Sequence, residues 1–289
     1  MPFYFDPQGN LRSQEFDRLP WLVHAFSTRA AGDLAQPAGR RRFVQSLSGN
    51  GMRLVTLHQI HSAVVRVAGA CTGACLSAGA ADLPRDSAPP GDALIAAEPG
   101  LLAGVKTADC LPILIADRRR RIVAAIHAGW RGLARRVVEK TIGELRRAFG
   151  CAPSDLAAAI GPGIQACCFE VGPEVLQEFA CQFVDAGRFC KPDPPNPALT
   201  ILPKQLMTGN QGLLRALAAD RGRVDLAGAA RRQLLAAGLT PGHIYNCGFC
   251  TACRLDRFYS YRREKEAAGR MLAVIGVRGE ALIDVRAAP

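Results

Sequence analysis

Residues 101–133 read LLAGVKTADCLPILIADRRRRIVAAIHAGWRGL, and this stretch decides the fold. It contains three short apolar runs, Leu101–Lys106, Leu111–Ala116 and Arg121–Ile126, and the charged residues Asp117–Arg120 join the second run to the third. Apolar runs of this length, bounded by charged residues or glycine, predict buried β-strands. The stretch therefore predicts adjoining strands of one sheet.

Side chains that can bind a metal lie at the edges of these predicted strands. Cys110 sits between the first two runs, and His127 follows the third. A third candidate, His61, ends the strand-like run Arg53–His61. His58 is three residues away and would face the opposite side of a strand, so we select His61. Together they offer part of a metal or nucleophile site, although each alone is equally typical of a buried structural histidine or cysteine.

The remaining periodicity predicts further strands and helices. A helix with one apolar face is predicted from Gly132 to Phe149, because apolar residues recur every three or four positions there. The other predicted helices cover residues 40–47 and 224–237 and begin near Pro173. The other predicted strands are Trp21–Thr28, Ala63–Val67, Ala93–Ala97, Leu156–Ile160 and Met271–Val277.

Five blocks of the sequence resemble the YfiH/laccase-domain family. They are TLHQIHSAVV, GDALIAAEPGLLAGVKTADCLPILIAD, AAIHAGWRG, AAIGPGIQACCFEVG, and CTAC followed five residues later by YSYRR. Members of this family were first labelled multicopper polyphenol oxidases and were later described as zinc-dependent purine nucleoside phosphorylases, with adenosine deaminase activity also reported. The resemblance implies that the metal ligands and catalytic residues are His61, Cys110 and His127.

The resemblance also implies a fold and an activity. The expected fold is α/β, with mixed sheets layered between helices as α/β/β/α, and residues 1–289 are expected to form one domain with an irregular proline-rich insertion at about 188–211. The expected reaction converts adenosine, inosine or methylthioadenosine and phosphate to the free base and ribose 1-phosphate. The expected cofactor is zinc, with copper(II) as the alternative ion because copper(II) outcompetes zinc for many ligand sets.

A ligand set of two histidines and one cysteine suits this chemistry, because it leaves one coordination position open, as catalytic zinc sites do. Zinc would lower the pKa of a bound water to about 7, which suits deamination. Phosphorolysis also needs an anion site, for which Arg29, Arg131 and Arg262 are the candidates, since a guanidinium group matches phosphate oxygens. Gln59 is expected to bind the base or to orient His61. The candidate proton carriers are Asp109, Glu170 and His58.

Three other functions stay open at this stage. Cys110 with His127 as its base would make a cysteine hydrolase, and one bacterial relative of the family has been linked to editing of a peptidoglycan precursor. The older label predicts a copper-binding polyphenol oxidoreductase, but the chain has only five histidines, too few for a multicopper oxidase. The net charge of +11 would suit a non-enzymatic nucleic-acid-binding protein, although no nucleic-acid motif is visible and we expect no such partner.

Composition sets the expected surroundings of the protein. Eleven cysteines without an export signal at the N-terminus predict free thiols and a metal site rather than disulfides. No apolar run approaches the ~18–20 residues that a membrane span needs. We expect a cytoplasmic monomer or homodimer whose partners are a purine nucleoside and phosphate, with no membrane association.

The cysteines outside the predicted metal set lie in small groups. Cys247, Cys250 and Cys253 follow His243 in a spacing that would suit a structural zinc, but we expect no metal there. The adjacent pair Cys167 and Cys168 is expected to be two small buried thiols. Cys71 and Cys75 are interpreted as incidental.

Overall fold

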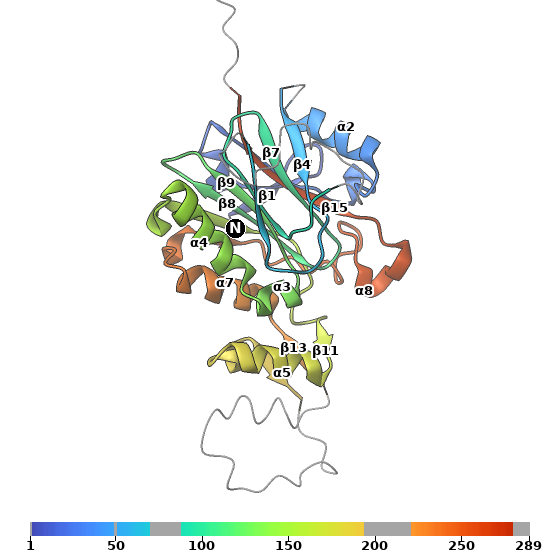
Figure 1. Ribbon diagram of the computed structural model, residues 1–289. Helices are drawn as coiled ribbons and strands as arrows, with labels where there is room; N and C mark the ends of the chain where they lie inside the picture. The colour runs from blue at the N-terminus through green and yellow to red at the C-terminus, as the bar shows by residue number, and fades with distance from the viewer. Residues whose placement is uncertain (1, 49–50, 70–87, 194–220, 280–289) are drawn as a thin grey trace, which may run out of the picture.

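The computed structural model describes residues 2–48, 51–69, 88–193 and 221–279, and Figure 1 shows how their helices and strands are arranged. Three sheets are present in these ranges. Sheet 1 has the strand order β1-β2-β3-β15-β7-β4, sheet 2 has the order β14-β10-β8-β9-β6-β5, and a small third sheet has the order β11-β13-β12.

The strands of the two large sheets are short, and those in the middle of each sheet are almost entirely buried. Sheet 1 consists of β1 (Phe3–Phe5), β2 (Leu11–Ser13), β3 (Leu22–Phe26), β4 (Arg53–Thr56), β7 (Leu101–Thr107) and β15 (Met271–Val277). Sheet 2 consists of β5 (Val65–Ala68), β6 (Ala93–Ala96), β8 (Leu111–Asp117), β9 (Val123–Ala128), β10 (Leu156–Ile160) and β14 (Ile244–Asn246). Both sheets are mixed, because β4 pairs with β7, β5 with β6, and β10 with β14 in parallel, while their other pairings are antiparallel.

The two large sheets pack face to face around a shared apolar core. Alternate residues of each strand point into this core, among them Val55, Val105, Ile275, Leu94, Leu114 and Val123. The residues between them point outward and are also buried, beneath helices. Burial on both faces is the reason that these strands appear in the sequence as continuous apolar runs rather than as an alternation.

Helices cover the two outer faces. On sheet 1, Phe43 and Val44 of α2 (Pro37–Ser48) pack on Leu54, Leu102 and Val274. On sheet 2, the apolar faces of α4 (Val137–Phe149) and α7 (Leu226–Ala236) pack on the strands. The order of layers is therefore α/β/β/α, which confirms the expected fold (Figure 1).

The third sheet and the remaining helices lie beside these layers. The sheet consists of β11 (Glu170–Val171), β12 (Cys190–Pro192) and β13 (Gly222–Val224), and α5 (Pro173–Gln182) lies next to it in Figure 1. The remaining α-helices of the described ranges are α1 (Gln14–Asp17), α3 (Trp130–Ala134) and α8 (Tyr261–Glu264). Short 3-10 turns cover Arg29–Ala31, Pro153–Asp155, Ala186–Arg188, Pro241–His243 and Lys265–Ala267.

Two predicted elements were wrong in their extent. The run Arg53–His61 is a strand only as far as Thr56, because the chain then leaves sheet 1 as a loop and His61 adopts a left-handed φ of 55°. The predicted helix from Gly132 to Phe149 is two helices, α3 and α4, because Arg136 has a left-handed φ of 62° between them. Neither break is marked by glycine or proline.

The proline-rich stretch at about 188–211 is only partly described. Its first residues are not irregular, since β12 pairs with β13 in the third sheet. Residues 194–211, like Cys71 and Cys75, lie outside the described ranges. In the part of the chain that is described, no helix has the length and apolar character needed to cross a bilayer.

Candidate metal centre and cavity

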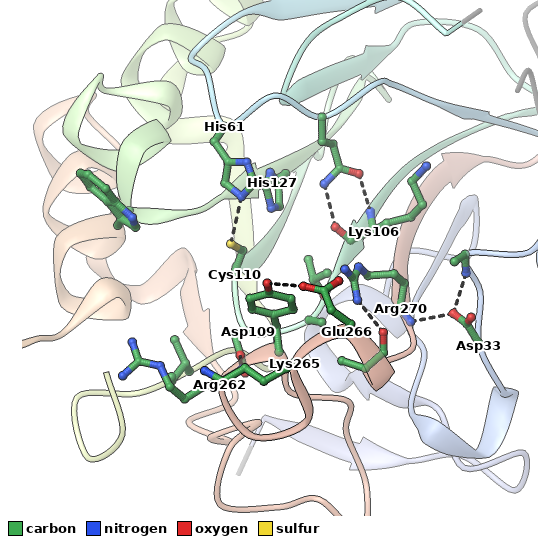
Figure 2. Close-up of a pocket in the computed structure, with 18 of the residues that line it drawn as sticks. Asp33, His61, Lys106, Asp109, Cys110, His127, Arg262, Lys265, Glu266 and Arg270 are labelled. Atoms are coloured by element: carbon green, nitrogen blue, oxygen red, sulfur yellow. Dashed lines mark hydrogen bonds between the residues drawn. The ribbon is translucent and has the colours of Figure 1, made fainter. Parts of the chain in front are cut away.

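His61, Cys110 and His127 meet at one end of the paired sheets. Cys110 lies in the turn between β7 and β8, His127 lies on β9, and the loop after β4 brings His61 over them (Figure 2). The antiparallel register of β8 and β9 pairs Pro112 with His127, so the turn that carries Cys110 lies beside the end of β9. A hairpin therefore supplies two of the three side chains.

The three side chains are spaced as metal ligands. One donor atom from each of His61, Cys110 and His127 lies within 4.8 Å of the others, and Cys110 Sγ is 3.9 Å from His61 Nε2. Tetrahedral zinc with sulfur and nitrogen ligands separates its donor atoms by about 3.5 Å. The donor set and its spacing thus fit one zinc or copper ion, and the three residues predicted from the sequence are brought together.

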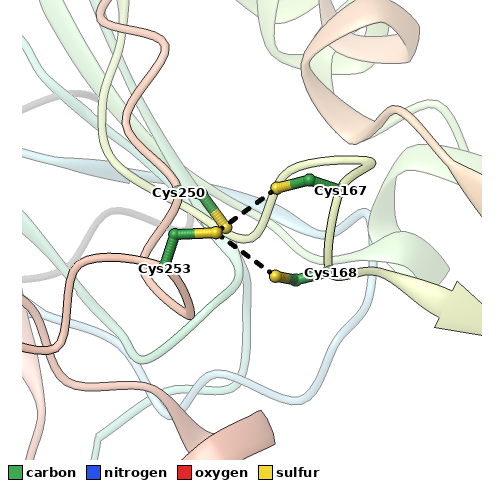
Figure 3. Close-up of side chains that lie close together, drawn as sticks. All are labelled: Cys167, Cys168, Cys250 and Cys253. Atoms are coloured by element: carbon green, nitrogen blue, oxygen red, sulfur yellow. Dashed lines mark hydrogen bonds between the residues drawn. The ribbon is translucent and has the colours of Figure 1, made fainter.

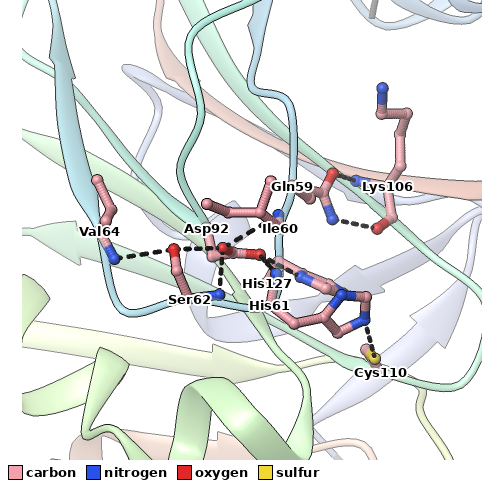
Figure 4. A network of polar contacts seen from close by, with 9 residues as sticks. All are labelled: Gln59, Ile60, His61, Ser62, Val64, Asp92, Lys106, Cys110 and His127. Carbon is pink, nitrogen blue, oxygen red and sulfur yellow. Dashed lines mark hydrogen bonds and ion pairs between the residues drawn. The ribbon is translucent and has the colours of Figure 1, made fainter.

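Asp92 holds two of these histidines in place. Its Oδ1 accepts hydrogen bonds from His127 Nδ1 at 2.8 Å and from the main-chain N–H of His61 at 3.0 Å. Its Oδ2 accepts from the N–H and the hydroxyl of Ser62, both at 2.6 Å, and from the N–H of Ile60 at 3.3 Å (Figure 4). Since Nδ1 of His127 is used in this way, Nε2 is the ring nitrogen that remains for a metal.

The same contacts shift the protonation of the centre in the metal-free protein. Burial disfavours the Cys110 thiolate, but the charge of His127 and hydrogen bonds from His127 and His61 lower the pKa of Cys110 to about 6. Burial disfavours protonation of His127, but Cys110 and Asp92 raise its pKa to about 9. Burial also disfavours the Asp92 carboxylate, yet hydrogen bonds from His127 and Ser62 lower its pKa to about 2. The shifts of Cys110 and His127 both favour a Cys110 thiolate beside a His127 imidazolium when no metal is bound.

The backbone around the centre is strained. His61, Asp109 and Lys265 have φ values of 55°, 92° and 53°, and these are three of the five non-glycine residues with positive φ in the described ranges. Such conformations cost about 1–3 kcal/mol each and persist where surrounding contacts enforce them, often at functional sites. All three residues line the cavity next to the centre.

The centre opens into a cavity of about 1020 Å³. Trp130, Phe169 and Tyr261 give it aromatic surface. Its charged lining is mostly basic and comprises Arg40, Lys106, Arg262, Lys265, Arg270, Asp33, Asp109 and Glu266. Figure 2 shows the His61–Cys110–His127 group on one side, Asp33 and Arg270 toward the other, and Glu266 and Lys265 between them. The cavity can therefore hold an anionic group and a flat apolar ring together.

Two of the predicted substrate residues, Gln59 and Arg262, line this cavity. The amide of Gln59 donates to Lys106 O at 2.7 Å and accepts from Lys106 N at 2.8 Å, so it fastens the loop before His61 to β7 (Figure 4). Arg262 donates through both terminal nitrogens to Glu170 O at 3.0 Å. The contact of Arg262 with phosphate and the contact of Gln59 with a purine base stay predictions.

The other two predicted substrate residues, Arg29 and Arg131, are not among the residues that line the cavity. The Arg29 guanidinium binds Glu264 Oε1 at 2.7 Å and lies 4.1 Å from the centre of the Tyr259 ring. Arg131 stacks over Trp130 in the five-residue helix α3, which is not the start of a long helix as predicted. Their contact with phosphate therefore also stays a prediction.

The three candidate proton carriers differ in how their polar atoms are used. Both oxygens of Asp109 accept hydrogen bonds of 2.6 Å, from Thr251 Oγ1 and from Arg262 N, so its carboxylate has a structural role. Glu170 lies outside the cavity lining and pairs with Arg221 at 3.4 Å. His58 lines the cavity, and it is therefore the candidate that the structure favours.

Sequence reasoning missed Asp92 as well as most of the charged lining of the cavity. Asp92 looked only like the start of a strand, and its position directly before the apolar run of β6 was the one signal of a buried carboxylate. Lys265 and Arg270 follow α8 and approach the centre only because β15 returns to the middle of sheet 1.

A second group of sulfur atoms lies near the centre. Cys167 and Cys168, in the loop between β10 and β11, face Cys250 and Cys253, in the loop after β14 (Figure 3). The expectation of two small buried thiols was wrong for Cys167, which is exposed, and for Cys168, which is half-buried. Cys247, the first cysteine of the C-x2-C-x2-C stretch, instead packs in the core between the large sheets.

Comparison with known proteins supports the same family for nearly the whole chain. A family model described as multi-copper polyphenol oxidoreductase laccase matches residues 29–278. The purine nucleoside phosphorylase of Bacteroides thetaiotaomicron is 34% identical over 184 residues, which are 64% of this chain and 60% of that protein. Purine nucleoside phosphorylase YlmD of Geobacillus stearothermophilus is 35% identical over 241 residues, 83% of this chain and 78% of YlmD.

Another relative and two solved structures extend this comparison. Adenosine deaminase RL5, from an unknown prokaryotic organism, is 34% identical over 62% of this chain and 59% of its own length. The crystal structure of YlmD from Geobacillus stearothermophilus has a TM-score of 0.73 at 27% identity, and that of Bacillus licheniformis protein YfiH has 0.77 at 24% identity. Both alignments cover 96% of this chain and 99% of the other, so the fold is shared throughout.

Proposed function

This chain belongs to the multi-copper polyphenol oxidoreductase laccase family, and we propose that it is a zinc-dependent purine nucleoside phosphorylase with adenosine deaminase activity at the same site. The observation that carries the proposal is the convergence of His61, Cys110 and His127 on a cavity with aromatic and basic walls. Relatives named purine nucleoside phosphorylase and adenosine deaminase support it.

The metal ligands are His61, Cys110 and His127, which leave one position open on a tetrahedral ion. When bound, the zinc supplies Lewis-acid chemistry and an activated water. Asp92 keeps His127 in the tautomer that offers Nε2 and holds the loop of His61 through its main-chain bonds. Asp92 thus keeps the three donor side chains together at the wall of the cavity.

The cavity supplies the remaining requirements of phosphorolysis. Trp130 and Phe169 offer flat apolar surface for a purine, and basic side chains such as Arg262 and Arg270 offer hydrogen bonds and charge for phosphate. In the reaction a phosphate oxygen bonds to C1′ of the ribose while the bond from C1′ to the purine nitrogen breaks. The departing purine takes up a proton, for which His58 is the candidate donor in the cavity lining.

The family description as a multicopper oxidase is not supported by the histidines of this chain. His24 is fully buried in sheet 1, where its Nε2 accepts the Ser13 N–H at 2.9 Å, and His243 lies 3.3 Å from Arg118. Within the described ranges the histidines of the metal centre are His61 and His127. A single ion is therefore what this site suits.

The test is to incubate the purified protein with adenosine and phosphate and to identify the products by mass spectrometry. We expect adenine and ribose 1-phosphate from the wild type and from Cys181→Ser, which alters an exposed cysteine outside both sulfur-containing groups. Neither product should form with Cys110→Ala or after chelation of the metal. Inosine as the main product would make deamination the principal reaction, and unchanged adenosine with zinc bound would refute the purine assignment.

Asp92 is hydrogen-bonded to His127, which in turn contacts Cys110, and this line of side chains favours a second candidate function, a cysteine hydrolase that acts on peptidoglycan precursors. An orienting carboxylate, an imidazole and a thiol of lowered pKa are the parts that such an enzyme needs. His61→Ala separates the two functions, because it removes a metal ligand but leaves that line intact. Hydrolysis of a peptidoglycan precursor that survives both His61→Ala and chelation would establish the hydrolase.

A further inference from the structure

The four cysteines of the second sulfur group come from two loops that are far apart in sequence. Cys167 and Cys168 lie between β10 and β11, and Cys250 and Cys253 lie between β14 and α8, more than 80 residues later. All four sulfur atoms lie within 4.8 Å of one another, and Cys253 Sγ is 3.6 Å from Cys167 Sγ and 3.4 Å from Cys168 Sγ (Figure 3).

The main chain holds the two loops against each other independently of the sulfurs. Gly163 N donates to Phe249 O at 3.3 Å, and Thr251 N donates to Gly163 O at 3.2 Å. Gly163 and Cys250 form an isolated parallel bridge. The convergence of the cysteines therefore follows from backbone pairing at this end of sheet 2, not from chance rotamers on a flexible surface.

The spacing of the sulfurs matches a single tetrahedral ion. Zinc binds thiolate at about 2.3 Å, which places the sulfurs of a tetrahedral four-cysteine site about 3.8 Å apart. An iron–sulfur cluster inserts several iron and sulfide ions between its cysteines and would spread their sulfurs more widely than this group allows. Soft thiolate ligands in tetrahedral array favour zinc over calcium, magnesium or manganese.

Two of the four sulfurs accept hydrogen bonds from groups outside the cluster. Gln165 N lies 3.5 Å from Cys250 Sγ and donates to it, and the Arg263 guanidinium donates to Cys168 Sγ at 3.7 Å. Four thiolates around Zn²⁺ carry a net charge of −2, and Arg263 offsets part of it. Donors to the sulfurs and a nearby cation are the features that stabilise such sites from outside the ligand set.

We propose that Cys167, Cys168, Cys250 and Cys253 bind a structural zinc ion, distinct from the ion of the His61–Cys110–His127 centre. A set of four cysteine ligands fills all four positions of the ion, so this zinc has a structural role and binds no substrate. It joins the loop after β10 to the segment that leads into α8.

This second zinc would also help to hold two residues of the cavity wall, Asp109 and Arg262, in place. Thr251, between two of the ligands, donates its hydroxyl to Asp109 at 2.6 Å, and Asp109 in turn accepts the Arg262 N–H at 2.6 Å. Asp109 directly precedes Cys110. The proposed ion therefore fixes the loop whose contacts set the positions of Asp109 and Arg262.

The experiment is a metal count on protein purified after expression with zinc, by inductively coupled plasma mass spectrometry. We expect two zinc ions per chain in the wild type and in the exposed-cysteine control Cys181→Ser. One should remain in Cys253→Ser and in Cys167→Ser, and one in Cys110→Ala. The double variant Cys110→Ala/Cys253→Ser should contain none.

A second measurement is X-ray absorption spectroscopy of Cys110→Ala. Because this variant leaves the four cysteines of the proposed site unchanged, the result does not depend on whether Cys167→Ser or Cys253→Ser folds. Its remaining zinc should show four sulfur neighbours at about 2.3 Å and no nitrogen. One zinc per wild-type chain that is lost in Cys110→Ala and retained in Cys253→Ser would overturn the proposal. A disulfide between the two loops, found by peptide mapping of the unreduced protein, would overturn it as well. None of these results depends on whether the enzyme acts on nucleosides.

Discussion

Replacing Asp92 by asparagine should weaken zinc binding although Asp92 itself is not a ligand. The carboxylate accepts five hydrogen bonds, two at Oδ1 from His127 and His61 and three at Oδ2 from Ser62 and Ile60. Every one of these neighbours is a donor, so two acceptor oxygens are needed. Asparagine has the same shape but offers only one.

Either orientation of the new amide is unfavourable. With its NH2 group toward His127, the imidazole must accept at Nδ1 and carry its proton on Nε2, which removes the metal ligand. With its NH2 group toward Ser62, the main-chain donors of the His61 loop lose their partner. Loss of a hydrogen bond to a charged group costs about 1.5–3 kcal/mol, and about 1.4 kcal/mol is tenfold in an equilibrium constant, so zinc affinity should fall about 10- to 100-fold.

The assay is competition for zinc against a chromogenic chelator, with wild type, Asp92→Asn and Asp117→Asn compared at one pH. Asp117 is the matched control, since it is equally buried but accepts from Arg119 N and Arg120 N at the opposite end of β8. Asp117→Asn should leave zinc affinity unchanged, because both of these main-chain hydrogen bonds go to Oδ1 and the amide oxygen of asparagine can accept them. An affinity of Asp92→Asn within twofold of the wild type would refute the reasoning.

Three further predictions concern the packing of the centre, a buried histidine and the free thiol. A Cβ on Gly129 would lie 2.9 Å from Cys110 Sγ and 3.1 Å from His61 Cδ2. Because overpacking costs about 1–3 kcal/mol, Gly129→Ala should lower zinc affinity about tenfold or more. The control Gly143→Ala, which has open space around its Cβ, should leave zinc affinity unchanged in the same competition assay. Burial lowers the pKa of His24 from 6.5 to about 3, so the unfolded chain binds a proton that the folded protein excludes. As the pH falls from about 6.5 to 3, up to about 5 kcal/mol of stability should therefore be lost. Denaturant unfolding should show a steeper fall in the free energy of unfolding toward acid pH for the wild type than for His24→Gln. In metal-free protein the rate of Cys110 alkylation by iodoacetamide, followed by peptide mapping, should rise with a midpoint near pH 6, and zinc should block it; a midpoint near the ordinary thiol value would contradict the assigned contacts.

Most strands could be predicted from the sequence because they are buried on both faces. Leu101–Thr107, Leu111–Asp117 and Met271–Val277 appear as short apolar runs between charged or glycine residues, and the structure confirms them within one or two residues. The layering of the sheets was expected only from the family resemblance, because strand pairing over long sequence separation leaves no local signal.

The errors have a common physical origin in tertiary contacts. Loop residues 57–61 continue the apolar pattern of β4, but Asp92 holds the main chain of His61, and Gln59 binds Lys106 of β7 through its side chain instead of through main-chain strand pairing. Arg136 breaks the predicted helix, and its guanidinium lies 4.4 Å from the Phe183 ring and binds Glu139. Contacts of this kind override local preference and cannot be read from spacing.

The metal ligands could be predicted in identity but not in arrangement. His61, Cys110 and His127 were selected by residue type and position at the ends of apolar runs, and a hairpin and one loop bring them together. The sulfur group was missed because each half of it, Cys167–Cys168 and Cys250–Cys253, looks incomplete alone. Backbone pairing around Gly163 and Cys250, residues far apart in the sequence, joins the two halves.

The central place of β15 in sheet 1 has a consequence for the order in which the protein folds. This strand pairs with β3 on one side and β7 on the other, so residues 22–26 meet their partner only after some 245 further residues have been synthesised. Contacts of such long sequence separation form slowly and leave apolar edges open in the meantime. The β8–β9 hairpin of Cys110 and His127 belongs to sheet 2, in which β15 is not a strand. The strands that carry Cys110 and His127 can therefore pair with each other before β15 is made, whereas sheet 1, on which they pack, is completed only by β15.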